Sequence, residues 1–595
     1  QAPAGDTPLP LGLGMTVGQD TMEPSRSHRF KGRTLAVIND LMLEEQWYLY
    51  QKTRELKLAI KTGEGLDKFR LRNQEFAVYT IFMEDSTRTK ESFRNAAEFH
   101  GMKVNVFDAQ TSSFTKNETI TDTIKMLCGY SIGQSIFVIR SKVEGVCRWL
   151  EGAINEYTTA RGYPPSSFIN AGDGRHEHPS QELLDEFSFL EQKGWDRDCI
   201  HLALLGDLFH GRTVHSKVDG LRIYDKVEVD LVAPAELALP KMYEDRMLAF
   251  GFHVRKFASI DEYLQQDKVA KIWYFTRLQL ERMGDKVLEK SLELRKAVTF
   301  QREFVGKLPP GTRFFHPLPR DARHPTLPFW LDNTELNGWD QQSQNGYFTR
   351  IVLLGMLAGL LGSDFESTAE IPPEPKSPGL SPANSAGERS RLGHALLGAS
   401  DFYEEVIRDD QTKDISSSEV GLMPLTNGIL IENLGEGQSV EKIWSLMYMV
   451  RSILGLDGIG GHGVYFGSSS PELARGYISV PELNINTWDR GQLKKLAAMA
   501  PGSILRVVDD GRIIKEFRLR LPPRIYNFPH ISCKNSACVS HRGNMQHEVG
   551  PYFVRVALRT GADKTESWAF SCKYCEMVHD FWRIWDYSHS EVTDY

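Results

Sequence analysis

A short polar segment between a predicted strand and a predicted helix carries the clearest chemical signal in this sequence. Residues 76–83 form a nearly continuous apolar run, typical of a strand buried on both faces of a parallel sheet. The residues that follow Ser86-Thr87-Arg88-Thr89 have helical spacing, so this segment lies where a helix N-terminus offers free backbone N–H groups. Its hydroxyls and guanidinium would add donors for a phosphate. A capped helix with a surface arginine would fit the same residues.

Polar residues also follow other predicted strands at the point where each strand ends. In an open parallel sheet, ligands bind at the carboxyl ends of the strands, so this repetition indicates one shared binding site. Several of these residues are arginines, which favour an anionic ligand with more than one anionic group. The strand-end segments are Arg140, 170–181, 206–215, 276–279 and 316–320.

The elements that must position these residues alternate strands with helices from about Phe30 to Gly362. Such alternation predicts α/β architecture with parallel sheets, and its length exceeds that of a typical single domain. We expect two doubly wound parallel-sheet domains at 30–164 and 165–339, with helices at 340–362 returning to the first. The predicted strands cover 76–83, 104–107, 135–139, 167–170, 200–205, 227–232, 271–276 and 312–315.

The remaining segments differ in composition. Residues 1–29 are rich in Pro, Gly and Thr and lack the features of a secretory signal, so we expect them to be disordered. A Pro/Ser-rich linker is predicted at 363–412, followed by folded blocks at 413–525 and 526–595. The net charge of −8 argues against general binding to nucleic acid or anionic membranes. No apolar run is long enough for a transmembrane helix.

Four clustered cysteines predict a metal site near the C-terminus. Cys533 and Cys538 are separated by four residues, and Cys572 and Cys575 by two, which gives two pairs of thiolate ligands. Such a set suits one tetrahedral structural zinc ion per chain. The remaining cysteines stand singly, as expected for reduced thiols in the cytoplasm. A nucleic-acid-binding zinc ribbon is less favoured, because the nearby basic residues are scattered among acidic ones.

The strand-end motifs, together with the loop at 111–119, closely resemble those of aspartate carbamoyltransferase over residues 30–362. Ornithine carbamoyltransferase shares the phosphate motif but has cysteine where this chain has Pro317. The resemblance implies transfer of the carbamoyl group of carbamoyl phosphate to L-aspartate in de novo pyrimidine biosynthesis. A non-catalytic scaffold with the same fold is the alternative. It is disfavoured because the arginines and His178 are all present.

The resemblance also implies a role for individual residues. Carbamoyl phosphate would be bound by Ser86, Thr87, Arg88, Thr89, Arg140, His178, Gln181, Leu318 and Pro319, and by Ser112 and Lys116 of a neighbouring subunit. The catalytic residues would be Arg88, Thr89, Arg140, His178 and Lys116, and aspartate would be bound by Lys116, Arg212, Arg277 and Gln279. Glu84 and Arg282 would take part in domain closure. The shared site implies a homo-oligomer, with a catalytic trimer as its minimal active unit and a hexamer of fused chains as the larger alternative.

The C-terminal part resembles the regulatory chain of the same family in residues 521–525, 533–541 and 572–576. It implies a natural fusion, with an α+β ferredoxin-like regulatory domain followed by a small zinc-binding β domain that docks on the catalytic part. Nucleotide effectors remain uncertain, because Ser479 and Glu516 stand where the family has lysines, and Glu432-Asn433 replaces Asp-His. We expect mainly an assembly module with weakened or altered effector binding.

Overall fold

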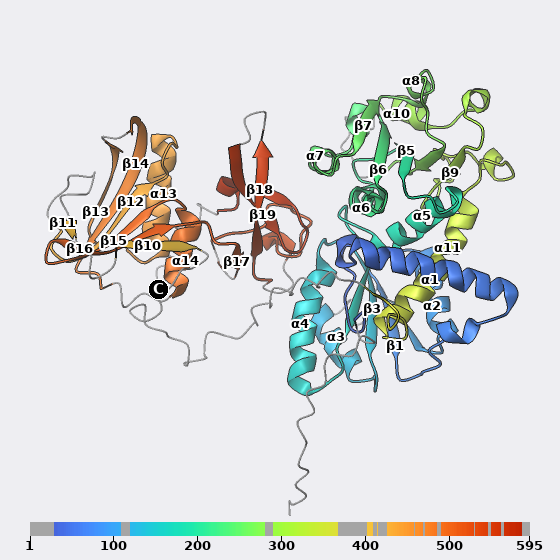
Figure 1. Cartoon of the computed structure of the whole chain (residues 1–595), viewed down its shortest axis with the longest axis horizontal. Coiled ribbons are helices and arrows are strands. Elements are labelled where there is room, and N and C mark those ends of the chain that lie inside the picture. Colours follow the sequence, from blue (N-terminus) through green and yellow to red (C-terminus); the bar gives the residue numbers. More distant parts are fainter. Residues whose placement is uncertain are drawn as a thin grey trace, which may run out of the picture.

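Two α/β units and two smaller β-rich units follow one another along the chain in the computed structural model (Figure 1). The structure describes residues 29–108, 119–279, 290–366, 402–407, 413–414, 425–456, 458–467, 470–484, 490–526, 528, 530–544, 549–560 and 565–585. None of the helices in these ranges is both long and apolar enough to cross a membrane.

The first unit is built on a four-stranded parallel sheet in the order β2-β1-β3-β4. Its central strand β1 is almost fully buried, as the apolar run predicted. The strands are β1 (Ala77–Phe82), β2 (Lys103–Asp108), β3 (Ser135–Ser141) and β4 (Ser167–Asp173), and the helices between them are α2 (Thr87–Phe99), α3 (Ile120–Cys128) and α4 (Val146–Arg161).

The second unit contains a five-stranded parallel sheet in the order β7-β6-β5-β8-β9. Strand β7 (His253–Phe257) was not predicted, because this edge strand carries charged residues and only its last side chain is buried. The other strands are β5 (Cys199–Leu205), β6 (Lys226–Val232), β8 (Ile272–Phe275) and β9 (Arg313–Phe315), with helices α6 (Arg212–Gly220), α7 (Lys241–Ala249), α8 (Ile260–Tyr263) and α10 (Ser291–Val298).

Three longer helices lie where the two parallel-sheet units meet: α1 (Leu43–Thr62), α5 (Pro179–Gln192) and α11 (Trp339–Leu357). Helix α5 is buried on every side from Pro179 to Leu190, and it packs on α6 and α11. One hydrophobic cluster runs through these helices and both sheets. The two units are therefore joined by a continuous core.

The sheet to which strand β4 belongs indicates where the first unit ends. It pairs with β3 in the first sheet, whereas the division drawn from the sequence at 164/165 placed it in the second unit. The Pro164-Pro165 pair is a loop before an edge strand. We therefore propose that the first unit extends through β4.

The third unit, the α+β unit, has a seven-stranded antiparallel sheet with the path β10-β16-β15-β12-β14-β13, and β11 pairs with β16. The run β12-α13-β13-β14-α14-β15 has the order and pairing of a ferredoxin-like fold, which confirms the predicted fold class. The strands are β10 (Tyr403–Ile407), β11 (Lys413–Asp414), β12 (Gly428–Leu434), β13 (Gly461–Gly467), β14 (Ser470–Pro481), β15 (Ile504–Asp509) and β16 (Arg512–Leu519), and the helices are α13 (Val440–Ile453) and α14 (Arg490–Met499).

The last unit is a four-stranded antiparallel sheet in the order β17-β18-β19-β20, drawn in red in Figure 1. Its strands are β17 (Arg524–Tyr526), β18 (Tyr552–Thr560), β19 (Thr565–Cys572) and β20 (Val578–Asp580). Short 3₁₀ helices occur throughout the chain, at Ile38–Asp40, Leu66–Phe69, Leu221–Ile223, Ala235–Leu237, Arg302–Lys307, Phe329–Leu331, Arg542–Asn544 and Phe581–Arg583.

Candidate active site and metal centre

The polar segment after β1 forms the start of α2. Ser86 is the N-cap residue, its carbonyl accepts the first helical bond from Lys90 N at 3.2 Å, and Thr87 is the first helical residue. Thr89 is buried, whereas the side chain of Arg88 is exposed. The tetrapeptide thus has the strand–turn–helix setting that an anion-binding helix N-terminus requires.

Glu84 joins two arginines that come from different units. Its Oε2 atom lies 3.1 Å from Arg212 Nη1, at the start of α6, and 3.7 Å from Arg140 Nε, near the end of β3. Arg212 also donates to the carbonyl of Gly174 at 3.2 Å, and Arg140 to that of Ala171 at 2.9 Å. The carboxyl ends of the two sheets therefore meet at one cationic site.

Gly172 allows the two arginines to approach this closely. Its φ is +110°, and a Cβ atom there would lie 3.0 Å from the guanidinium of Arg212 and 3.1 Å from Arg140 Nη1. Any side chain would be strained by the backbone and would push the guanidinium groups apart. The loop after β4 is thus shaped around both arginines.

His178 is the residue before α5 and is buried beside this site. Burial lowers its pKa well below the ordinary range, and the positive charges of Arg140 and Arg212 act in the same direction. Its backbone N–H donates to Ser216 Oγ at 3.0 Å. His178 is therefore a neutral imidazole that can offer one ring N–H to a ligand.

The segment after β9 reaches the site from the second sheet. Leu318 has a φ of +56°, and its backbone N–H donates to His316 Nδ1 at 2.7 Å. Burial lowers the pKa of His316 to about 3, with contributions from three arginine charges. Those charges belong to Arg320, Arg88 and Arg277, so residues from the ends of β1, β8 and β9 share one electrostatic environment.

The candidate aspartate-binding residues lie at the ends of β5 and β8. The backbone N–H of Gln279 donates to Asp207 Oδ2 at 3.1 Å, and its side-chain amide donates to the carbonyl of His210 at 3.3 Å. Arg277 is half-buried in the same segment. The predicted site residues Ser112, Lys116 and Arg282 lie outside the described residues.

Sequence reasoning missed several polar residues around the site. Arg350 on α11 is buried, donates to Ser92 Oγ at 2.7 Å and adds positive charge near His178. Asp185 and Gln342 are also buried, and they lie on α5 and α11. In the sequence, each of these residues could have been noticed as a polar residue within an otherwise apolar helical stretch.

Neutral buried imidazoles predict a specific pH dependence of stability. His316 binds a proton near pH 6.5 in the unfolded chain but only near pH 3 in the folded one, so the free energy of unfolding falls as the pH drops below 6.5. The fall should be about 1.4 kcal/mol per pH unit for this residue. Urea unfolding of the protein and of its His316→Asn variant between pH 7 and pH 5 measures it. If the free energy of unfolding depends on pH equally in both proteins, the lowered pKa of folded His316 is contradicted.

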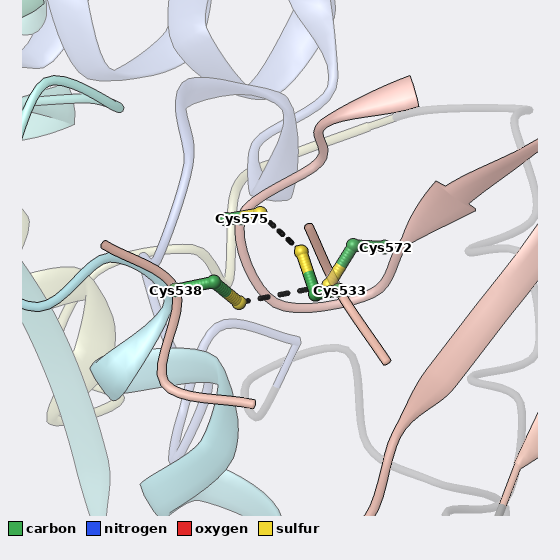
Figure 2. Close-up of side chains that lie close together, drawn as sticks. All are labelled: Cys533, Cys538, Cys572 and Cys575. Atoms are coloured by element: carbon green, nitrogen blue, oxygen red, sulfur yellow. Dashed lines mark hydrogen bonds between the residues drawn. The ribbon is translucent and has the colours of Figure 1, made fainter. Parts of the chain in front are cut away.

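The four clustered cysteines are brought together from two parts of the last unit, the segment after β17 and the end of β19. Figure 2 shows their sulfur atoms pointing toward one another; Sγ of Cys533 lies 3.6 Å from that of Cys575, and Sγ of Cys538 lies 3.8 Å from that of Cys572. Four thiolates on a tetrahedral zinc ion are about 3.8 Å apart, from the Zn–S length of about 2.3 Å. All four cysteines are buried, so the residues fit a structural metal ion.

The cysteine cluster packs against the first unit. The backbone of Glu144 donates to the carbonyl of Ala537 at 2.8 Å and accepts from Val539 N at 2.9 Å, and its carboxylate accepts from the Asn535 amide at 2.5 Å. Nearby, His176 Nε2 lies 3.3 Å from Glu576 Oε2. The last unit, which is the metal-binding unit, therefore contacts the loops that follow β3 and β4.

Comparisons with known proteins agree with both parts of this arrangement. Residues 33–191 match the model of the aspartate/ornithine carbamoyltransferase carbamoyl-P binding domain, and residues 523–585 match that of the aspartate carbamoyltransferase regulatory chain metal binding domain. Protein PyrBI of Thermotoga maritima is 46% identical over 93% of this chain and 99% of its own length. The chain belongs to the aspartate carbamoyltransferase family, as a fusion of catalytic and regulatory chains. It is thus an aspartate carbamoyltransferase of pyrimidine biosynthesis.

Two further relatives match only the catalytic part of this aspartate carbamoyltransferase. The aspartate carbamoyltransferase catalytic subunit of Thermococcus kodakarensis is 32% identical over 56% of this chain and 99% of its own length. The aspartate transcarbamoylase of Trypanosoma cruzi, solved in complex with carbamoyl phosphate, is 28% identical; it covers 56% of this chain and 97% of its own, with a TM-score of 0.47.

Proposed function

We propose that the chain converts carbamoyl phosphate and L-aspartate into N-carbamoyl-L-aspartate and phosphate at the site between the two parallel sheets. The observation that carries this proposal is the convergence of Arg140 and Arg212 on Glu84, beside the N-terminus of α2. Arginine side chains from both units suit two substrates that are both anions, because a planar guanidinium can bind a carboxylate or a phosphate through two hydrogen bonds. Bringing them together would supply most of the rate enhancement through orientation.

The first unit would bind carbamoyl phosphate. Its phosphate would contact Ser86, Thr87, Arg88 and Thr89 and the guanidinium of Arg140. The carbonyl oxygen would face Thr89, Arg140 and His178, whose donors would stabilise the negative charge that develops as the amine attacks. The neutral state of His178 fits this role, because it donates a hydrogen bond without transferring a proton.

The second unit would bind aspartate. Arg212, Arg277 and Gln279 would hold its two carboxylates, so that the amine faces the carbamoyl carbon. Gln181, Leu318 and Pro319 would hold the amino group of carbamoyl phosphate. The departing phosphate would receive the proton of the amine, so the reaction needs no strong protein base. Glu84 would link the units on closure through Arg212 and Arg282.

A carbamoyltransfer assay tests the reaction. With carbamoyl phosphate as donor, we expect carbamoyl-aspartate to form and ornithine to be a poor acceptor, because the site offers cations for a second carboxylate. Turnover of ornithine in preference to aspartate would overturn the proposal.

We further propose a homotrimer as the minimal active unit, with Ser112 and Lys116 reaching the site of a neighbouring subunit. Exposed apolar side chains on the first unit, including Ile132 at 83% exposure, support an interface between copies. A hybrid of inactive Lys116→Ala and Arg88→Ala chains should regain part of the parent activity. Some of its sites would then contain an intact Arg88 from one chain and an intact Lys116 from the neighbouring chain. No recovery after verified subunit exchange would contradict a shared site.

We propose that the metal ion is structural zinc, held by Cys533, Cys538, Cys572 and Cys575, with one ion per chain. Zinc would cross-link the segments that contact Glu144 and would perform no step of the reaction. His579 Nε2, 3.3 Å from Cys533 Sγ, could donate a hydrogen bond to that thiolate. Reduced thiols in such a site fit a cytoplasmic enzyme.

The α+β unit should bind nucleoside triphosphates weakly. Arg506 forms ion pairs with Glu432 and with Glu516, the latter at 2.7 Å, and both carboxylates are buried. The internal pairing occupies the cation, and the carboxylates would repel a triphosphate. Calorimetric titration with CTP and ATP is expected to show no micromolar binding, while carbamoyl phosphate titrated into the same sample should bind. Micromolar affinity for either nucleotide would refute this assignment.

A further inference from the structure

Lys217 on α6 is a fully buried lysine that the proposed reaction does not use. Its side chain has no exposed surface, and its ammonium lies 2.8 Å from Glu182 Oε2 and 2.8 Å from Asp185 Oδ2. The ring of Tyr274 on β8 covers it at 4.1 Å from the ring centroid. A buried ion pair is weak evidence for stability, because the desolvation of its charges offsets their attraction. This one calls for another explanation.

Burial and pairing together determine the charges of this cluster. Burial lowers the pKa of Lys217, but the carboxylates of Asp185 and Glu182 outweigh it and raise the pKa above the ordinary range, so the lysine stays charged. Burial raises the pKa of Glu186 well above its ordinary value, and the charge of Glu182 adds to this, so Glu186 is neutral. Burial raises the pKa of Glu182 to about 7, although the charge of Lys217 opposes this shift, so the lysine contacts the carboxylate of Asp185 and a Glu182 carboxyl group that titrates near neutral pH.

Asp185 connects this lysine to a residue of the candidate active site. While its Oδ2 atom is bound to Lys217, its Oδ1 atom accepts two side-chain amides: Gln181 Nε2 at 2.8 Å and Gln342 Nε2 at 2.6 Å. Rotation of the carboxylate would break all three bonds at once. The ammonium thus fixes the direction in which Asp185 holds both amides.

Gln342 carries the connection to the segment after β9. Its Oε1 atom accepts the backbone N–H of His316 at 2.8 Å, and His316 Nδ1 accepts the backbone N–H of Leu318 at 2.7 Å. Asp185 is therefore linked to Gln181 directly and to Leu318 through two further residues. Under the proposed function, these two groups hold the amino group of carbamoyl phosphate.

We propose that Lys217 and Asp185 are positioning residues for the carbamoyl group. Their ion pair, set between α5, α6 and α11, holds Gln181 and the turn at Leu318 in the geometry that receives the amino group. The pair touches no substrate itself. This inference rests on the proposed function, since it assigns the carbamoyl end of that same site.

A double variant that removes the pair tests this role, because Glu182, whose pKa burial already raises to about 7, takes up a proton once Lys217 is gone and leaves no lone charge. Lys217→Met with Asp185→Leu substitutes apolar side chains of similar length, a change that buried ion pairs often tolerate. Because Gln181 and Gln342 lose their shared acceptor, KM for carbamoyl phosphate should rise about tenfold, while KM for aspartate at saturating carbamoyl phosphate stays within about twofold. An unchanged KM for carbamoyl phosphate, or an equal rise for both substrates, would overturn the inference.

Two single variants separate positioning from folding. Gln342→Leu leaves the ion pair intact and removes only the link from Asp185 to His316, so KM for carbamoyl phosphate should still rise by about three- to tenfold. Glu182→Gln is the matched control, because Glu182 contacts Lys217 but neither amide, and its KM should equal that of the parent. If the double variant does not fold, the Gln342→Leu result decides, and an unchanged KM there overturns the inference.

The parent protein distinguishes a failed inference from a failed function. If it does not transfer the carbamoyl group to aspartate, the proposed function fails and the inference fails with it. If the parent is active and the variants keep its KM, only the positioning role is wrong.

Discussion

Replacement of Arg88 by alanine is expected to lower carbamoyl-aspartate formation by about a thousandfold or more, since the loss of a single preorganised donor already lowers kcat by about 10²–10³. Arg88 lies in the first turn of α2, where its guanidinium would add a full positive charge to the free backbone N–H groups. It would contact the phosphate both in bound carbamoyl phosphate and as the phosphate departs. Steady-state kinetics with both substrates varied measures the loss.

The control for this prediction lies on the same helix. Arg94 is exposed and pairs with Glu91 and Glu98 on the surface of α2. Arg94→Ala should keep the parent kcat and KM, because surface pairs of this kind contribute little. Both variants should keep the melting temperature of the parent, since neither side chain is buried. Near-normal turnover by Arg88→Ala would remove the central assignment of the site.

The strand ends explain why so much of the site could be predicted from sequence. Parallel strands bring their carboxyl ends to one edge, so Arg140 near the end of β3 and His178 after β4 were expected near the tetrapeptide after β1. The link from Glu84 to Arg140 and Arg212 agrees with that expectation. Each of these residues stands next to a strong local pattern, and the pattern alone fixes its place in the fold.

Other features depend on packing that no local pattern records. The contact of Asp185 with Lys217, Gln181 and Gln342 requires three helices to meet at set angles, and these residues read singly as polar interruptions of apolar helices. Strand β7 was missed because it is a charged edge strand. Sequence spacing therefore located the candidate site residues at strand ends, but it could not find the buried residues that support them.

Replacement of Cys538 by serine should have the second large effect, on the metal-binding unit. A serine hydroxyl is a poor ligand for zinc, and the free energy of zinc binding in such a site is also free energy of folding. The metal content should fall from about one ion per chain to about none. Because Ala537 and Val539 flank Cys538 and bond to Glu144, the contact with the first unit should be lost as well.

Limited proteolysis and assay can be combined to follow both consequences of Cys538→Ser. Cleavage should become rapid between residues 526 and 585, while carbamoyltransfer stays within about threefold of the parent, because Arg88, Arg140, Arg212 and His178 all lie on the two parallel-sheet units. The matched control is Cys199→Ser, at a half-exposed cysteine outside the cluster, which should keep the metal and the protease resistance. A Cys538→Ser protein that binds metal stoichiometrically and resists cleavage would show that the cluster does not hold this unit together. Loss of activity in step with loss of metal would instead make the metal-binding unit part of the catalytic machinery, through its contact with the loops after β3 and β4.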